Sequence, residues 1–127
     1  MPIIEIRTLP FSKSFDIPEI LKRLNAEAAS AMNIEERHVW SYWEFIEAHQ
    51  YAVGSQTSEC LTVDTHSPVV KVIAFEGKST EAAEKLLETI ARVLAEELEI
   101  DIANIFVYYQ TVSSGNVFDG GQIVRKK

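Results

Sequence analysis

Hydrophobic and polar positions in the first half of the chain follow the pattern of a strand, a helix and a second strand. Residues 3–9 are rich in β-branched side chains and end at Pro10, which predicts a strand. Asp16 and Glu19 have the spacing of a capping box, so we expect a helix to begin there. Apolar residues then recur at helical spacing, at Ile17, Ile20, Leu21, Leu24 and Ala28. The aromatic-rich residues 39–46 predict the second strand.

The second half repeats this order of elements. Residues 69–75 predict a strand, a turn follows at 76–78, and Ser79 is a residue type favoured as a helix N-cap. The apolar helical stripe consists of Ala83, Leu86, Leu87, Ile90 and Leu94. Residues 105–109 predict the fourth strand, and a C-terminal hairpin is expected around Gly115, Gly120 and Gly121. The polar stretch 55–67 reads as a linker, with a short strand at 61–63 left open.

The two halves are copies of one unit. A shift of 66 residues, which carries Pro2 onto Pro68, places apolar residues on apolar residues over most of the unit. The matched pairs include Ile4 and Val70, Leu24 and Ile90, Ile34 and Ile100, Trp40 and Phe106, and Tyr42 and Tyr108. We therefore predict one domain over residues 1–127, with pseudo-repeats at about 2–60 and 68–127. The fold class is α+β, with two tandem β-α-β units forming a four-stranded mixed sheet and both helices on one face.

The other face of this sheet is expected to be covered as well. Residues 69–75 and 105–109 are apolar on both sides of the strand, which is typical of a sheet buried on both faces. Two helices cover only one face. The simplest cover for the second face is another copy of the chain.

Composition narrows the classes of partner. The net charge is −7 and the only basic run is residues 125–127, interpreted here as a solvated tail, which argues against nucleic acid. No apolar run is long enough for a membrane span, and the N-terminus lacks the features of a signal peptide. Cys60 is the single cysteine, so a reducing, cytoplasmic location is predicted. The three histidines are scattered without metal-ligand spacing, and we expect neither a metal nor a cofactor.

A family resemblance rests on the start of each unit and on the C-terminal glycines. Pro2 directly follows Met1 and opens a strand, and the second unit runs from Pro68 through the 76–79 turn to the segment 115–121. These features resemble the tautomerase superfamily, whose members use an N-terminal proline. The second unit is similar to a 4-oxalocrotonate tautomerase subunit. Two fused units of this length resemble macrophage migration inhibitory factor and 5-carboxymethyl-2-hydroxymuconate isomerase, which are trimers with inward-facing sheets. The resemblance therefore implies a homotrimer.

The resemblance also implies an activity, the tautomerisation or isomerisation of small enol or α-keto carboxylates with Pro2 as the acid/base. A free N-terminal amine has a pKa of about 7.7–8.0, and burial in an apolar pocket lowers it. Lys78 is the candidate clamp for the carboxylate of this small-molecule partner. Residues that would line the substrate pocket are Trp40, Phe106 and Tyr108, with Tyr42 beside them. Each has a plain alternative: Pro2 begins a strand, Lys78 is a solvated turn lysine, and the aromatic residues pack the sheet.

Two features keep a second function open. Where 4-oxalocrotonate tautomerase carries a strand arginine, this chain has Phe106, with Trp40 at the same place in the first unit. If Met1 is retained, the Pro2 nitrogen is an amide and cannot act as a base. The alternative is a non-catalytic trimeric protein of this fold that binds a small ligand or a protein partner. Arg7, a weaker candidate cation, is interpreted as a partner of Glu5 or of a neighbouring copy.

Overall fold

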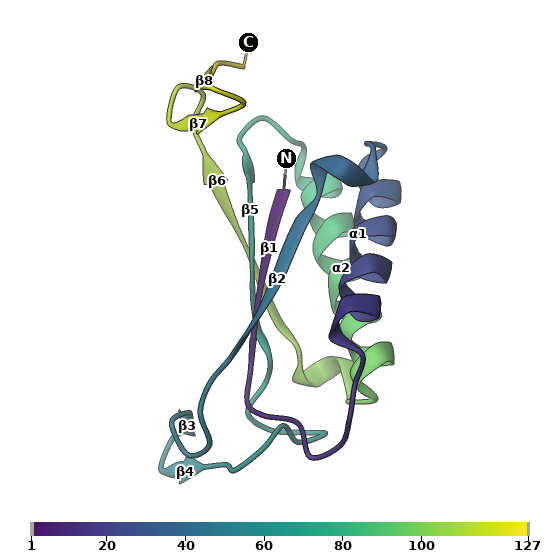
Figure 1. The fold of residues 1–127 in the computed structure, drawn as a ribbon, viewed down its shortest axis with the longest axis vertical. Coiled ribbons are helices and arrows are strands. Elements are labelled where there is room, and N and C mark those ends of the chain that lie inside the picture. Colours follow the sequence, from purple (N-terminus) through teal and green to yellow (C-terminus); the bar gives the residue numbers. More distant parts are fainter. Residues whose placement is uncertain (1, 127) are drawn as a thin grey trace.

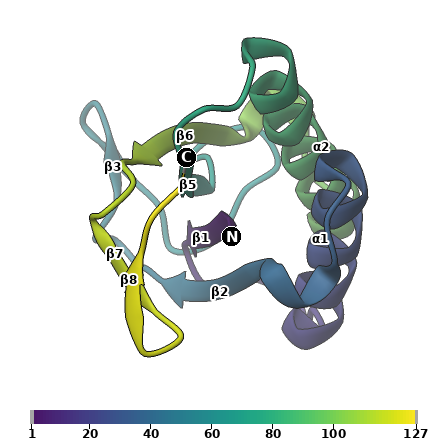
Figure 2. The same ribbon diagram turned by 90° about the horizontal axis from the view of Figure 1, so that it is seen from above.

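The computed structural model describes residues 2–126, and it contains one mixed four-stranded sheet with two helices on one face (Figures 1 and 2). The elements of the first unit are β1 (Pro2–Thr8), α1 (Ile17–Met32), the 3₁₀ turn η1 (Glu36–His38) and β2 (Trp40–Phe45). Those of the second are β5 (Val69–Phe75), α2 (Thr80–Leu98), η2 (Ile102–Asn104) and β6 (Phe106–Val112). The predicted fold class is confirmed.

The strand order is β2-β1-β5-β6, so the two repeats meet in the middle of the sheet. Within each repeat the strands are parallel, as a β-α-β unit requires, and between the repeats β1 and β5 are antiparallel. At the centre of the sheet Glu5 is the register partner of Lys71. Because a shift of 66 residues also relates these two positions, the internal repeat has its axis between them.

Both helices begin where the sequence pattern indicates. The Asp16 carboxylate accepts a hydrogen bond from the Glu19 backbone N–H at 3.2 Å, and the Ser79 hydroxyl accepts one from Ala82 at 3.1 Å. The two C-caps are Asn33 and Glu99, with left-handed φ values of 55° and 56°. These caps are also 66 residues apart, so the repeat extends to the backbone of the helix ends.

Two segments differ from the sequence-based expectation. Residues 61–63 do not form a strand; instead β3 (Ala52–Val53) and β4 (Gln56–Thr57) form a small hairpin. Gly54, with φ of 60°, makes its tight turn, and His66 Nε2 lies 2.9 Å from the Gln56 carbonyl oxygen. Strand β6 extends to Val112 rather than ending at residue 109, because it stays in register with β5 over its whole length.

The expected C-terminal hairpin is present. It consists of β7 (Val117–Asp119) and β8 (Gln122–Val124), joined through Gly120 and Gly121 at positive φ. Figure 1 shows this hairpin at the end of the sheet where the chain begins.

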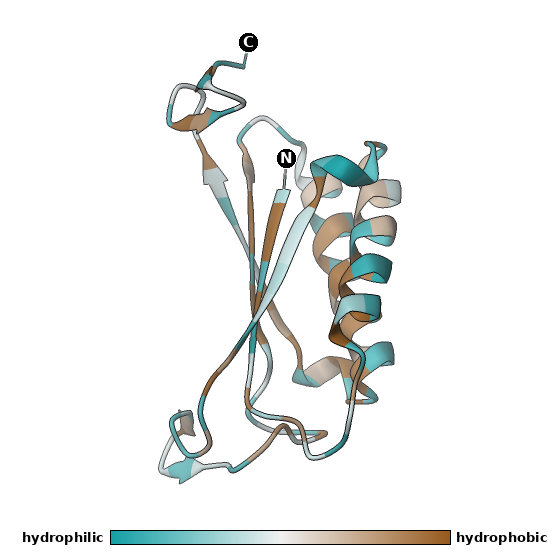
Figure 3. Cartoon of the chain, in the orientation of Figure 1, coloured by the Kyte–Doolittle hydropathy of each residue, from teal (hydrophilic) through white to brown (hydrophobic). Residues whose placement is uncertain are grey.

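The core lies between the sheet and the helices. Ile4 and Ile6 of β1 and Val70 and Val72 of β5 are fully buried under α1 and α2. The helices contribute the buried side chains of Ile20, Leu24, Ala28, Leu86, Ile90, Val93, Leu94 and Leu98. Figure 3 shows hydrophobic residues along the central strands and on the helix sides nearer the sheet. Within residues 2–126, neither helix is long and apolar enough to cross a membrane.

Candidate functional site

A cavity of about 320 Å³ lies beyond the last residues of β5, at the end of the sheet where β1 begins. Pro2 is buried and is the register partner of Ala74, the residue before Phe75 in the cavity wall. The residues that line the cavity are Met32, Ile34, Phe75, Glu76, Gly77, Lys78 and Lys126. The turn from β5 to α2, the C-terminal end of α1 and the chain's C-terminal segment therefore meet close to the start of β1.

The charges of this cavity favour an anion. Its two cations are Lys78 and Lys126, and neither makes an ion pair with any residue in the range 2–126. Its one acid, Glu76, lies within 3.4 Å of the Ser113 hydroxyl, which donates to it. The first turn of α2 begins at Thr80, two residues after Lys78, and a helix N-terminus adds a favourable field for negative charge. A small carboxylate suits this setting, with an apolar wall from Met32 and Ile34.

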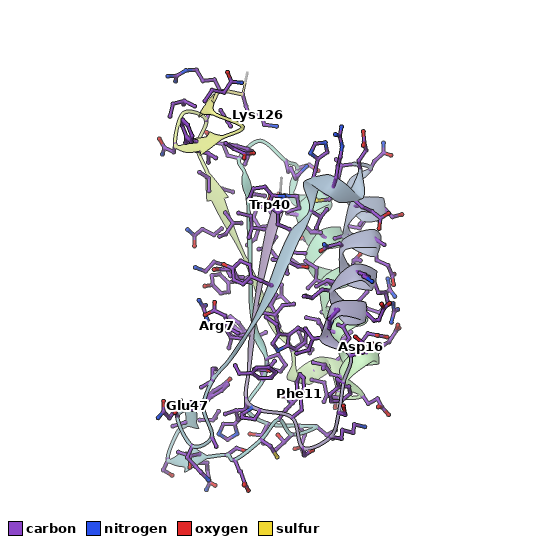
Figure 4. All side chains as sticks on the ribbon, viewed as in Figure 1. Arg7, Phe11, Asp16, Trp40, Glu47 and Lys126 are labelled. Atoms are coloured by element: carbon purple, nitrogen blue, oxygen red, sulfur yellow. The ribbon has the colours of Figure 1, made fainter. Side chains whose placement is uncertain are left out.

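Lys126 was not predicted as a site residue. Its backbone N–H donates to the Ser114 hydroxyl at 2.6 Å, and its ammonium lies 4.9 Å from the centre of the Phe75 ring. The C-terminal hairpin thus returns the chain end to the cavity, and Figure 4 shows Lys126 at the same end of the sheet as Trp40. The sequence signal was the basic run 125–127, which was interpreted as a solvated tail because a run of three charges at a chain end is commonly solvated. The contact of Lys126 with Phe75, 51 residues earlier in the chain, has no local sequence signal.

The residues predicted to bind substrate do not all come together within one chain. Trp40 lies at the same end as Pro2, because it is the register partner of Ile3. Phe106 is the register partner of Val69, at the other end of β5, which places it about 17 Å from the level of Pro2 along the strands. Tyr108 lies between them, opposite Lys71. The roles of Pro2, Lys78, Trp40, Phe106 and Tyr108 in a site stay predictions, and Met1 lies outside the described residues.

The sheet face away from the helices, the open face, carries a row of four polar side chains. Tyr42, Glu5, Lys71 and Tyr108 are successive register partners across β2, β1, β5 and β6. The Tyr42 hydroxyl donates to the Glu5 carboxylate, and Lys71 Nζ lies 3.2 Å from it. The hydrogen bond from Tyr42 and the Lys71 ammonium lower the pKa of Glu5, against the opposing effect of burial. The same hydrogen bond raises the pKa of Tyr42 to about 12.

The rest of the open face is largely apolar and exposed. Trp40 is 48% exposed and Phe106 57%, although both are large aromatic residues. Arg7, on the same face, lies 3.4 Å from Glu44 across β1 and β2, rather than pairing with Glu5 as interpreted from the sequence (Figure 4). The reason is register: Glu44 lies directly opposite Arg7, and Glu5 is already held by Tyr42 and Lys71.

The lowered pKa of Glu5 gives a prediction for stability in acid. A carboxylate whose pKa is lower in the folded than in the unfolded state stabilises the fold above its ordinary value, 4.5, and this stabilisation is lost as the pH falls. We expect the free energy of unfolding to decrease from about pH 5 to pH 3, and less steeply in Glu5→Gln. Urea titrations at fixed protein concentration measure both slopes.

The matched control is Glu88→Gln, at an exposed position of α2, which should keep the wild-type slope. Glu27, whose pKa is lowered by Arg92 and Arg23, contributes the same remaining slope in all three proteins. If Glu5→Gln and wild type lose stability in parallel, the Glu5 pairing contributes nothing measurable.

Comparisons with solved structures show which known fold this chain shares. No family model and no curated protein matches the chain. Among solved structures, Pt0534 inactivated by 2-oxo-3-pentynoate is 15% identical, with a TM-score of 0.83 over 96% of this chain and 94% of that one. The F6 fused 4-OT asymmetric trimer is 18% identical, with a TM-score of 0.80 over 95% and 94%. Macrophage migration inhibitory factor of Toxoplasma gondii is 13% identical, with a TM-score of 0.67 over 94% and 97%.

The chain has the tautomerase fold. The resemblance identified from Pro2, the 76–79 turn and the C-terminal glycines is thus confirmed at the level of the fold.

Proposed function

We propose that this protein is a Pro2-dependent tautomerase or isomerase of small enol or α-keto carboxylates. The observation that carries the proposal is the cavity beside the start of β1, in which Lys78 and Lys126 have no ion-pair partner within residues 2–126. A carboxylate is the small anion that such a pair of ammonium groups would hold. The inactivation of Pt0534, a protein of the same fold, by 2-oxo-3-pentynoate, an α-keto carboxylate, supports the same substrate class.

The chemistry needs only the movement of one proton. In the ketonisation of an enol, the Pro2 nitrogen would take up the proton of the enol oxygen and return one to the double-bond carbon that does not carry the oxygen. The C=C bond becomes a C=O bond to the same oxygen, with no net oxidation. Burial of Pro2 favours its neutral amine, the form that acts as a base. Lys78 and Lys126 would bind the substrate carboxylate and stabilise the negative charge that develops on oxygen.

We further propose that the protein is a homotrimer with its open sheet faces turned inward. The fused 4-OT of the same fold forms a trimer, and exposed Trp40 and Phe106 need a cover. A site at the border between two copies would also let Phe106 or Tyr108 of one copy approach the Pro2 end of the next. Sedimentation at micromolar concentration that gave only a monomer would refute the trimer.

The first test is the intact mass of protein expressed without an N-terminal tag, followed by turnover of phenylenolpyruvate. We expect a mass that lacks Met1 and measurable ketonisation. A second protein with one extra residue fixed before Pro2 is the control, because its Pro2 nitrogen is an amide. Equal turnover of the two proteins would exclude Pro2 as the base. A mass that retains Met1 in the native protein would favour the non-catalytic, ligand-binding alternative.

Lys126 gives a separate test of the anion site. We expect Lys126→Ala to raise KM for phenylenolpyruvate about ten-fold, which corresponds to ~1.4 kcal/mol of carboxylate binding. Removal of the substrate carboxylate should cancel the difference between the two proteins. Lys85→Ala, at an exposed lysine of α2, is the control and should leave KM unchanged. An unchanged KM in Lys126→Ala would remove this residue from the site.

A further inference from the structure

The open face consists of two halves related by the internal repeat. The shift of 66 residues carries Glu5 onto Lys71 and Tyr42 onto Tyr108, and these four residues form the single row across the sheet. The repeat axis therefore crosses the open face between Glu5 and Lys71. A half turn about this axis exchanges β1 and β2 with β5 and β6.

The apolar parts of the two halves are nearly equivalent. Ile3 corresponds to Val69, and Trp40 corresponds to Phe106. In each half the aliphatic residue lies directly opposite the aromatic residue, on the neighbouring strand. A copy of the chain that was turned by half a revolution would thus present almost the same apolar surface to its neighbours. Apolar packing alone distinguishes poorly between the two orientations.

The polar residues differ between the halves. Acidic Glu5 corresponds to basic Lys71, and the ion pair of Arg7 and Glu44 corresponds to the neutral residues Ile73 and Gln110. Ile73 and Gln110 are themselves register partners, so a charged pair in one half takes the place of an uncharged pair in the other. A half turn of one copy about the repeat axis would exchange the positions of Glu5 and Lys71 at the centre of the face. The same half turn would move the Arg7–Glu44 pair to the half that β5 and β6 occupied.

A second copy of this chain is the partner that fits such a face. The chain carries a net charge of −7, but the four charged side chains of the face, Glu5, Lys71, Arg7 and Glu44, balance to zero. The open face therefore has no net charge that would attract a strongly basic or strongly acidic partner. Each positive group has a negative group beside it, so copies that meet in a fixed orientation can oppose unlike charges.

We propose that Glu5, Lys71, Arg7 and Glu44 fix which way up each copy packs where the open faces of the proposed trimer meet. The proposal rests on the self-association in the proposed function and adds its orientation. Charges at a covered interface select against the wrong arrangement more than they add affinity, because a misplaced buried charge is costly. That the choice is a real one for this fold is supported by the fused 4-OT whose trimer is asymmetric.

The experiment uses fluorine NMR on protein in which the two tryptophans are 5-fluorotryptophan. Trp40 lies on the open face, whereas Trp43 faces the helices and donates to the Thr8 hydroxyl at 2.9 Å. If all copies pack the same way up, wild type gives one signal for each tryptophan. In Glu5→Gln/Lys71→Gln/Arg7→Ile/Glu44→Gln, in which both halves carry like residues, the Trp40 signal should split into two or more while Trp43 stays single.

A charge-swapped variant, Glu5→Lys/Lys71→Glu, keeps a salt bridge in the row. It therefore tests the proposal even if the neutral variant fails to fold. Its row favours the turned orientation while Arg7 and Glu44 favour the original one, so the Trp40 signal should split here too. Glu19→Gln/Lys22→Gln removes an exposed ion pair of α1, 3.0 Å between Nζ and Oε1, and should leave both signals single.

Three results would overturn the proposal. These are a single Trp40 signal in both variants, several Trp40 signals in assembled wild type, or a wild-type monomer by sedimentation. The phenylenolpyruvate assay tests the catalytic role of Pro2 by itself, so a failed enzyme and a failed interface give different results.

Discussion

Replacing Pro2 by Ala is expected to lower the turnover of phenylenolpyruvate by about 10²–10⁴-fold, the contribution of a well-placed general acid or base. Pro2 occupies the first position of β1, is buried, and is the register partner of Ala74, the residue before Phe75 in the cavity wall. Removal of its ring changes the base from a secondary to a primary amine and loosens its position. The loss should appear in kcat, because in the proposed site the carboxylate is bound by Lys78 and Lys126, so that substrate binding should change little. Steady-state kinetics over a range of substrate concentrations separates the two parameters.

The internal repeat supplies a control at the equivalent position. Pro68 precedes β5 as Pro2 begins β1, and it too is buried. Its nitrogen is an amide within the chain, so it has no basic form. Pro68→Ala should therefore keep kcat within about two-fold of wild type, although both substitutions remove a proline next to a central strand. A Pro2→Ala protein that kept wild-type kcat would show that the Pro2 ring is not needed for catalysis. A Pro68→Ala protein that lost kcat equally would show that both prolines act through structure.

The fold was predictable because it depends on local patterns. Capping residues Asp16 and Ser79 mark both helix starts, and each prediction is confirmed by a hydrogen bond to the third residue beyond. Strand 69–75 was predicted at its observed bounds because its apolar run ends in a turn that contains Gly77. By contrast, the hairpin of β3 and β4 is held by His66, ten residues beyond Gln56, and a polar stretch of this kind gives no periodic signal.

Only those residues of the candidate site that a local sequence pattern marks could be predicted. Pro2 was identified because it follows Met1 and opens a strand, and Lys78 because it lies in a turn between a strand and a helix. Lys126 required the return of the C-terminal hairpin, and the Glu5–Lys71 pair required the register between the two repeats. Both are contacts between distant segments. The repeat itself contained the missing information, since it relates Glu5 to Lys71, but only the antiparallel contact of β1 and β5 places them side by side.

The Ile90→Ala substitution is expected to reduce the free energy of unfolding by about 2–5 kcal/mol, the range for a large-to-small change at a well-packed core position. Ile90 is fully buried on α2, between the sheet and α1. Ile102→Ala is the matched control, because Ile102 is 55% exposed in η2 and the same atoms are removed. It should cost about 0.5 kcal/mol or less. Urea unfolding at one fixed protein concentration measures both, since self-association adds a concentration-dependent contribution.

This pair of variants also separates the core from the open face. If the layer between sheet and helices is the main source of stability, Ile90→Ala should shift the urea midpoint whether or not the copies are associated. If the covered open face were instead the main source, dilution would lower the stability of wild type more than the loss of the Ile90 side chain does. A similar effect of Ile90→Ala and Ile102→Ala would contradict the assignment of the core. We expect the first result, because the residues that pack against α1 and α2 include the four most central strand positions, Ile4, Ile6, Val70 and Val72, each with 0% exposure.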